Sequence, residues 1–253
     1  MKQNLKKLLD KLNHLEREEV FFDLMPRFFL EGLRKYLRVE VEGLEHLPKR
    51  GRALIVPNHS GFAGFDAVIL ANEIQRSKGR VPRLMAHKLW FMNNWMTQAG
   101  KKFGLVEATT DNAREALNRN HLVVLFPEGE EGNFKPSIEK YRLKEFKRGF
   151  IRLAVESEAP IIPTVIIGAE ETHITLFQIR ALRKYFGLII PIPLNLFPLP
   201  ARWKIRFLEP VFIPEGARLC EDEESVHDLC ESLQAKIQHA IDEELQKRGN
   251  PYF

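Results

Sequence analysis

From residue 38 onward, short apolar runs alternate with longer segments in which apolar residues recur at helical spacing. The apolar runs predict strands at Arg38–Glu42, Ala53–Val56, Arg83–Ala86, Leu105–Ala108, Leu122–Phe126, Ile161–Ile167 and Trp203–Val211. Helical patterns lie between them near residues 66–76, 111–119 and 146–157. Apolar strands joined by helices are typical of a parallel sheet that is covered on both faces. The pattern therefore predicts an α/β fold with a mostly parallel central sheet flanked by helices.

An amphipathic segment precedes this pattern at residues 1–36. Leu5, Leu8 and Leu12 share a helical face, and the aromatic-rich stretch Val20–Leu30 follows them. Such a segment either packs on the domain or lies in a membrane interface with its aromatic residues among the headgroups. We carry the second interpretation forward, with amphipathic membrane-facing helices at 1–36 and a single α/β domain at 37–253.

The domain ends in a further amphipathic helix, which we predict at residues 222–248. Its apolar face consists of Val226, Leu229, Cys230, Leu233, Ile237, Ala240, Ile241 and Leu245. An apolar stripe along one face is typical of a helix that packs on a sheet.

Residues 185–200 form a second stretch with a possible membrane role. This stretch combines large apolar side chains with four prolines, which exclude a regular helix. Either it covers the core as an extended segment or it inserts shallowly into a bilayer. The basic and aromatic residues Arg202–Lys204 that follow it favour insertion, because such residues gather at membrane interfaces.

Composition narrows the range of partners. The net charge is +4 and basic residues do not cluster with aromatic ones, so we expect no nucleic-acid partner. An anionic membrane surface fits this charge. No run reaches the ~18 apolar residues of a membrane-spanning helix, and the charged N-terminal pattern does not resemble a secretory signal. We therefore expect a peripheral or monotopic protein on the cytoplasmic face of a membrane. Cys220 and Cys230 are expected to be free thiols.

Candidate chemistry begins where the predicted strand at 53–56 ends. Pro57 and Asn58 terminate the strand, His59 follows, and Asp66 opens the next helix. Open α/β sheets bind ligands at the carboxyl ends of their strands. A neutral imidazole there can accept a hydroxyl proton, and a carboxylate on its other nitrogen supports the imidazolium. We predict that His59 is a general base and Asp66 its orienting partner.

Three other segments carry candidate site residues. Glu128 and Gly129 form a turn after the strand at 122–126, where a carboxylate can hydrogen-bond a substrate hydroxyl and a glycine permits close backbone approach. Pro163 interrupts the apolar run at 161–167. Lys101 lies shortly before the strand at 105–108, where an ammonium group can meet a phosphate.

Three motifs together resemble the glycerolipid acyltransferase family, whose members include lysophosphatidate and glycerol-3-phosphate acyltransferases. They are Asn58-His59-Ser60 with Asp66, then Phe126-Pro127-Glu128-Gly129, and finally Ala159-Pro160-Ile161-Ile162-Pro163. Their order and separations fit the family, and the resemblance covers roughly residues 50 to 215.

The resemblance implies transfer of a fatty acyl group to a hydroxyl, as in phospholipid biosynthesis. The donor would be a thioester of coenzyme A or acyl carrier protein, acting as co-substrate, with no cofactor and no metal. His59 would be the base and Asp66 its partner. Glu128 and Gly129 would belong to the acceptor site, and Pro163 would shape the acyl pocket.

The histidine motif departs from the family in its spacing. Six residues separate His59 from Asp66, whereas four are usual in the family. Gly61 and Gly64 lie within this segment and can absorb the two extra residues. We therefore expect the pair to form despite the longer connection.

The acceptor motif departs from the family as well. Phosphate-accepting members usually carry an arginine shortly after a glycine such as Gly104, and here none follows at that place. Arg83 and Lys101 are the cationic residues that we assign to the acceptor site instead. The identity of the acceptor, a lysolipid or a neutral glyceride, stays open.

Two other functions remain as alternatives. A lipid thioesterase or lipase would use Ser60 as nucleophile, although Ser60 adjoins His59 and no Gly-x-Ser-x-Gly turn is present. A non-catalytic lipid-binding protein would keep the fold without turnover. The leading hypothesis is an O-acyltransferase at a membrane surface.

Overall fold

The structure is a computed structural model that describes residues 25–60, 64–213 and 216–253. The chain divides into two units, residues 1–36 and 37–253. In the first unit the structure describes helix α3 (Met25–Tyr36), which exposes Phe28 and Phe29. The rest of the predicted N-terminal amphipathic segment, residues 1–24, lies outside the described residues, so its membrane-facing role stays a prediction.

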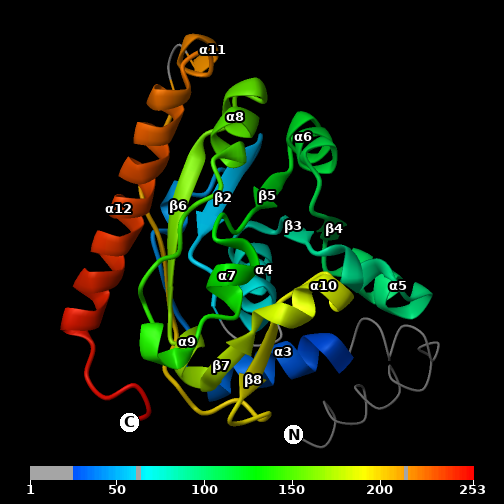
Figure 1. The fold of residues 1–253 in the computed structure, drawn as a ribbon, viewed down its shortest axis with the longest axis vertical. Helices are drawn as coiled ribbons and strands as arrows, with labels where there is room; N and C mark the ends of the chain where they lie inside the picture. The colour runs from blue at the N-terminus through cyan, green and yellow to red at the C-terminus, as the bar shows by residue number, and fades with distance from the viewer. Residues whose placement is uncertain (1–24, 61–63, 214–215) are drawn as a thin grey trace, which may run out of the picture. The chain divides into compact units, whose positions relative to one another are not determined.

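The second unit is built on a seven-stranded sheet in the order β1-β9-β6-β2-β5-β3-β4 (Figure 1). Its strands are β1 (Glu40–Glu42), β2 (Ala53–Pro57), β3 (Arg83–Ala86), β4 (Leu105–Glu107), β5 (Leu122–Val124), β6 (Ile161–Ile167) and β9 (Lys204–Phe207). Strands β6, β2, β5, β3 and β4 are parallel, while β9 is antiparallel to β6 and β1 is parallel to β9. The predicted α/β fold with a mostly parallel sheet is confirmed.

Helices cover both faces of the sheet, as crossover connections require. The helices described in this unit are α4 (Phe65–Lys78), α5 (Asn94–Lys102), α6 (Thr110–Asn118), α7 (Gly129–Asn133), α8 (Gly149–Glu156), α9 (Ala169–Thr172), α10 (Arg183–Phe186), α11 (Gly216–Leu219) and α12 (Glu223–Lys247). The crossover through α4 runs across the sheet in the direction opposite to those through α6 and α8. Because such crossovers are right-handed, α4 covers one face and α6 and α8 cover the other, together with α12.

Most predicted elements occur within a few residues of their expected bounds. Strands β3 and β6 span the predicted residues, and the helix predicted at 222–248 is α12. Helix α8 begins at Gly149 rather than near 146, and the backbone N–H groups just before it donate outside the helix, that of Phe146 to Gln234 and that of Lys147 to the Pro127 carbonyl. Helix α5 was not predicted.

The proline-rich stretch at 185–200 has a structure that the sequence did not predict. Strand β8 (Ile190–Pro193) pairs with β7 (Thr175–Ile179) in a separate antiparallel hairpin. Ile189 beside it is fully buried, whereas Tyr185 in the same half of the stretch is 77% exposed. The second half exposes Leu194, Leu196 and Phe197. Shallow insertion of this stretch into a bilayer stays a prediction.

Candidate active site

The carboxyl ends of β2 and β5 form the centre of the candidate site. These neighbouring strands are followed by helices on opposite faces of the sheet, α4 after β2 and α8 after β5. A crevice opens at such a point, because the segments that follow the two strands turn to opposite faces of the sheet. His59 leaves β2 at this edge and Glu128 leaves β5.

The predicted pairing of His59 and Asp66 occurs. The Nδ1 atom of His59 lies 2.6 Å from Oδ2 of Asp66, and the Asp66 side chain is completely buried. Asp66 is the second residue of α4, and Gly64 precedes that helix with a φ of 70°, in the left-handed region that glycine tolerates. The longer connection between the two residues therefore still brings them into contact.

The rest of the Asp66 carboxylate is held by backbone groups. Oδ2 also accepts from the Ser60 N–H at 2.9 Å, and Oδ1 accepts from the Ala67 N–H at 2.8 Å. Three donors thus hold one buried carboxylate beside the imidazole. A carboxylate in this place keeps the proton on Nδ1 of His59 and leaves the lone pair on Nε2.

The imidazole is also held from its face. The ring of Phe126 stacks on His59 with centroids 4.0 Å apart, and 14% of the histidine side chain remains exposed. A ring fixed by a hydrogen bond and by stacking keeps one orientation toward an incoming hydroxyl. Phe126 thereby acquires a role in the site that the strand prediction did not give it.

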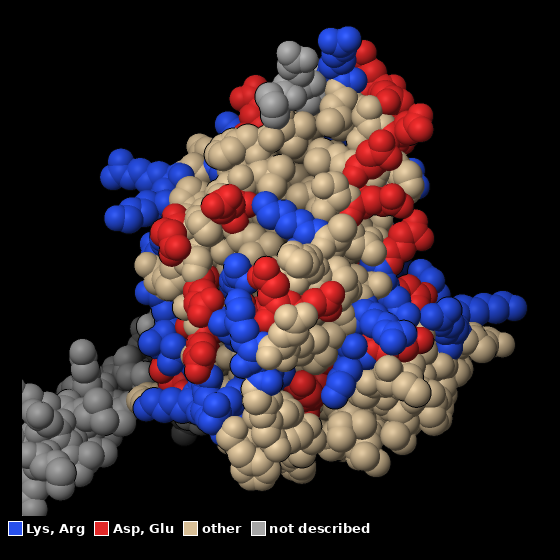
Figure 2. Space-filling view, turned by 90° about the vertical axis from the view of Figure 1, so that its left-hand side faces the viewer, with Lys and Arg blue, Asp and Glu red and all other residues tan. Residues whose placement is uncertain are grey.

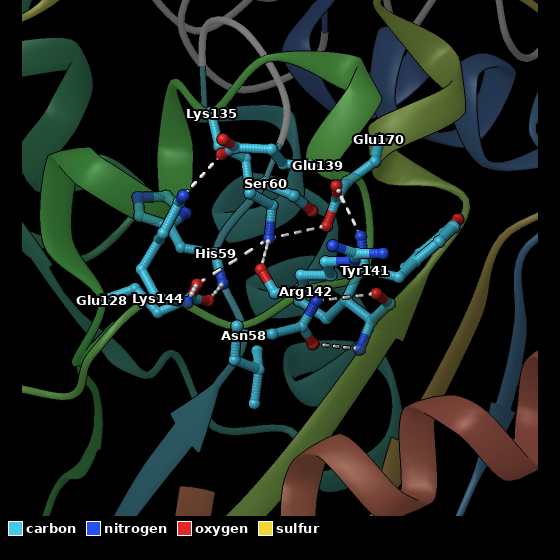
Figure 3. A network of polar contacts seen from close by, with 12 residues as sticks. Asn58, His59, Ser60, Glu128, Lys135, Glu139, Tyr141, Arg142, Lys144 and Glu170 are labelled. Atoms are coloured by element: carbon cyan, nitrogen blue, oxygen red, sulfur yellow. Dashed lines mark hydrogen bonds and ion pairs between the residues drawn. The ribbon is translucent and has the colours of Figure 1, made fainter.

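The Glu128 carboxylate accepts hydrogen bonds from two backbone N–H groups of the site. Its Oε1 accepts from the N–H of His59 at 2.8 Å and its Oε2 accepts from the N–H of Lys144 at 2.7 Å (Figure 3). The residue is 1% exposed. Each carboxylate oxygen can accept a further hydrogen bond, so the predicted contact of Glu128 with a substrate hydroxyl stays a prediction. Glu128 ties the end of β2 to the segment after α7.

Asn58 makes a similar tie that sequence reasoning missed. Its side chain accepts from the N–H of Ile166 at 2.7 Å and donates to the Ile166 carbonyl at 3.0 Å, which joins the end of β2 to β6. Asn58 is completely buried. An asparagine directly after a buried strand was the available signal, since such a polar side chain must find partners.

A buried charge cluster extends from Glu128. Nζ of Lys135 lies 3.0 Å from Oε1 of Glu170 and 3.7 Å from Oε2 of Glu128, and it donates to the Arg142 carbonyl (Figure 3). The other oxygen of Glu170 accepts from the Tyr141 N–H. Burial raises the pKa of the Glu170 carboxyl to about 7, and the charge of Lys135 opposes that shift.

A cleft of about 650 Å³ opens beside Glu128. Lys144, Phe146 and Lys147 are among the residues that line it. A methyl group added to Gly129, whose φ is 58°, would lie 3.0 Å from Nζ of Lys147. The ammonium group of Lys147 therefore lies over the Gly129 backbone, in a place that sequence reasoning did not consider.

The other predicted site residues lie elsewhere. Arg83 begins β3 and is thus at the amino edge of the sheet, where its charge adds to burial in lowering the pKa of His121. Lys101 is exposed in the last turn of α5, just before β4 begins. The structure does not bring either one to the edge that holds His59. Pro163 lies inside β6 opposite Val56, buried in the sheet.

Comparisons with known proteins agree with this fold. Residues 38–167, about half of the chain, match the acyltransferase family model. An uncharacterised protein of Mycobacterium tuberculosis is 35% identical over 240 residues, which are 90% of this chain and 66% of that protein. A Mycobacterium leprae protein is 33% identical, with 90% and 65% covered. The chain thus spans about two thirds of the length of these relatives.

More distant similarities point the same way. A 1-acyl-sn-glycerol-3-phosphate acyltransferase of Limnanthes alba is 25% identical over 167 residues, covering 64% of this chain and 53% of the enzyme. The crystal structure of the 1-acyl-sn-glycerophosphate acyltransferase PlsC from Thermotoga maritima has a TM-score of 0.57 at 19% identity. The match covers 96% of this chain and 88% of PlsC, and it shows a likeness in fold.

The fold and the site define an α/β protein in which a histidine, paired with a buried aspartate, lies at the carboxyl ends of two neighbouring parallel strands. The chain belongs to the acyltransferase family, since the family model matches about half of it. The resemblance of its motifs to glycerolipid acyltransferases is confirmed.

Proposed function

We propose that the protein is a membrane-associated O-acyltransferase. It moves a fatty acyl group from an acyl-CoA or acyl-carrier-protein thioester to a hydroxyl of a glycerolipid acceptor. The hydrogen bond of 2.6 Å between His59 and Asp66, in a chain of the acyltransferase family, carries this proposal. A hydroxyl nucleophile needs a base that removes its proton, and an imidazole whose second nitrogen is held by a buried carboxylate is such a base.

The reaction requires one proton to be removed and returned. Nε2 of His59 accepts the proton of the acceptor hydroxyl while the hydroxyl oxygen attacks the thioester carbonyl carbon. The C–S bond then breaks, and the imidazolium returns the proton to the departing thiolate. Asp66 stabilises the imidazolium in between. The products are an ester and the thiol of coenzyme A or of the carrier protein.

We assign the anionic groups of the substrates to the cleft beside Glu128. Phosphate is present in coenzyme A, in the carrier's phosphopantetheine and in phosphorylated acceptors. Lys147 and Arg148 line this cleft, and cationic groups bind phosphate; Lys144 lines it as well, paired with Glu139. The first acceptor to test is 1-acyl-sn-glycerol-3-phosphate, because the relative from Limnanthes alba is named for that substrate.

Association with the cytoplasmic face of a membrane is part of the proposal. Among the described residues, no helix is both long and apolar enough to cross a bilayer. Peripheral attachment agrees with the exposed apolar side chains of α3 and of the stretch after β8.

Replacement of the base tests this function. His59→Ala should lower the rate of acyl transfer at least about 10²-fold, which is the lower end of a general base's contribution. The assay uses labelled acyl-CoA and acyl carrier protein with a panel of lysophospholipids, monoacylglycerol and diacylglycerol, and identifies products by mass. A wild-type rate in folded His59→Ala protein would contradict the mechanism.

The neighbouring serine provides the matched control. Ser60 is 1% exposed and, among the described residues, its hydroxyl has no hydrogen-bond partner. Ser60→Ala should therefore retain acyl transfer. Complete loss of activity in Ser60→Ala, with hydrolysis as the wild-type reaction, would favour the thioesterase or lipase function instead.

A further inference from the structure

The hairpin formed by β7 and β8 carries a group of exposed apolar side chains. Leu176 and Phe177 are each 52% exposed, and Leu194, Leu196 and Phe197 are 64%, 73% and 87% exposed. We call these five residues the apolar hairpin patch. Figure 2 shows uncharged side chains gathered at the lower end of the molecule, where Figure 1 places β7 and β8.

Backbone contacts hold the five residues at one end of the hairpin. The N–H of Leu194 donates to the Ile174 carbonyl at 2.7 Å, which places the end of β8 beside the start of β7. The Asn195 side chain accepts from the Ile174 N–H and donates to the Phe197 carbonyl. A bulge between Thr175 and Phe177 breaks the alternation of β7. Neighbouring residues Leu176 and Phe177 are therefore both exposed.

The opposite end of the hairpin is fixed to the candidate site. Glu130 in α7 pairs with Arg183 at 2.7 Å and accepts from the Ile189 N–H at 3.0 Å. Glu131 pairs with Arg180 at 2.9 Å. These acidic residues directly follow Glu128 and Gly129. These contacts join the hairpin to the segment that directly follows Glu128.

The chain path places the hairpin at the same edge of the sheet as His59. Strand β6 is parallel to β2, and its carboxyl end continues through α9 into β7. The patch and the histidine thus lie at the carboxyl end of the parallel strands. If a bilayer contacts the patch, a lipid acceptor that leaves the bilayer reaches the edge that holds His59 first.

We propose that the apolar hairpin patch docks the protein on an anionic phospholipid bilayer and turns the His59 edge toward it. Large apolar side chains enter the interface, and the exposed cation Lys184, between the two strands, meets anionic headgroups, while Arg180 and Arg183 stay paired with Glu131 and Glu130. The choice of a bilayer over a protein partner rests on the proposed lipid acceptor.

Vesicle binding by the full chain tests this surface. The double variant Phe177→Ser/Phe197→Ser should bind vesicles of phosphatidylcholine and phosphatidylglycerol, in equal amounts, at least tenfold more weakly in co-sedimentation. The matched control is Phe212→Ser. Phe212 is 71% exposed and follows Val211, which bridges to the start of β6 at the opposite edge of the sheet. The Phe212→Ser variant should bind vesicles like the wild type.

Three outcomes would overturn the proposal. They are unchanged binding by the double variant, an equal loss in Phe212→Ser, and a change of oligomeric state in the double variant without a change in vesicle binding. The last would identify a second copy of the chain as the occupant. His59→Ala should bind vesicles normally, so a failed catalytic mechanism and a failed docking surface give different results.

Discussion

At the scale of single residues, Asp66 has the most constrained environment in the site. Its two oxygens accept from the imidazole of His59 and from the backbone N–H groups of Ser60 and Ala67. All three partners act as donors, and the carboxylate is completely buried. A carboxylate satisfies this set of partners because it only accepts hydrogen bonds. An amide would direct an NH₂ group at one or more donors.

Asp66→Asn is therefore expected to lower kcat about 10²–10⁴-fold with a smaller change in KM. The amide either loses one of these hydrogen bonds or favours the imidazole tautomer in which Nε2 carries the proton and cannot act as a base. Asp111→Asn is the matched control, because Asp111 is also the second residue of a helix and its side chain is 92% exposed. Steady-state kinetics of acyl transfer measure both. Equal kcat values in the two variants would refute the role of Asp66.

At the scale of elements, the short helix α7 shapes the site through its close packing on Glu128. A Cβ at Gly132 would lie 2.4 Å from Cβ of Glu128 and 2.8 Å from its Oε2. The glycine leaves room for the side chain that holds the backbone of His59. The same helix carries Glu130 and Glu131, which fix the hairpin. One turn of helix thus links the base to the proposed docking surface.

Gly132→Ala should displace Glu128 or α7 and reduce the free energy of unfolding by about 1–3 kcal/mol, as overpacking does. Acyl transfer should fall with it. Gly149→Ala at the start of α8 is the matched control, since an added Cβ there meets nothing within 4 Å. That control should stay within about 0.5 kcal/mol of the wild type. Urea denaturation compares the two, and similar stabilities would show that the predicted overlap is relieved at no cost.

At the scale of the whole molecule, buried charges join segments that are distant in the chain. Lys135 meets Glu170, and the neighbouring Glu171 accepts from the Tyr141 hydroxyl and from Arg248, each at 2.5 Å. Arg248 directly follows α12, so the C-terminal helix is tied to the region after β6. Ionisation within this group is therefore coupled to global stability.

Glu170 should give the protein a measurable pH dependence. Its pKa is about 7 in the folded protein and about 4.5 for an ordinary glutamate, so between these values the folded state holds a proton that the unfolded state has lost. The free energy of unfolding should consequently fall as pH rises from about 4.5 to about 7. In Glu170→Gln this fall should be smaller, as measured by urea denaturation across that range. Exposed Glu224→Gln should keep the wild-type slope, and an unchanged slope in Glu170→Gln would contradict the assignment.

Much of the fold was predictable because its elements have strong local signals. The fully buried strands β2 and β6 are mostly apolar runs, with Pro163 and Thr164 inside β6, and α12 has a long apolar stripe. The β7–β8 hairpin lacked such a signal, because Pro191 and Pro193 make β8 resemble an irregular segment. Its pairing with β7 is decided by contacts across the chain.

The candidate site was predictable only in part. His59 and Asp66 stand where a strand ends and a helix begins, which is a local pattern. Arg83 and Lys101 were assigned by charge alone, and they lie near the amino ends of their strands. Charge gives no information on which edge of a sheet a residue reaches. Lys135 and Lys147 were missed because the residues they contact are distant in sequence.

The sequence by itself determined the strand–helix alternation, the family and the identity of the histidine–aspartate pair. These follow from local periodicity and from short motifs. The tertiary structure alone decided that six intervening residues still allow the pair to meet, and that Glu128 holds backbone groups. It also decided that the hairpin shares an edge with His59. Such relations depend on strand order and packing, which bring together residues that no local pattern connects.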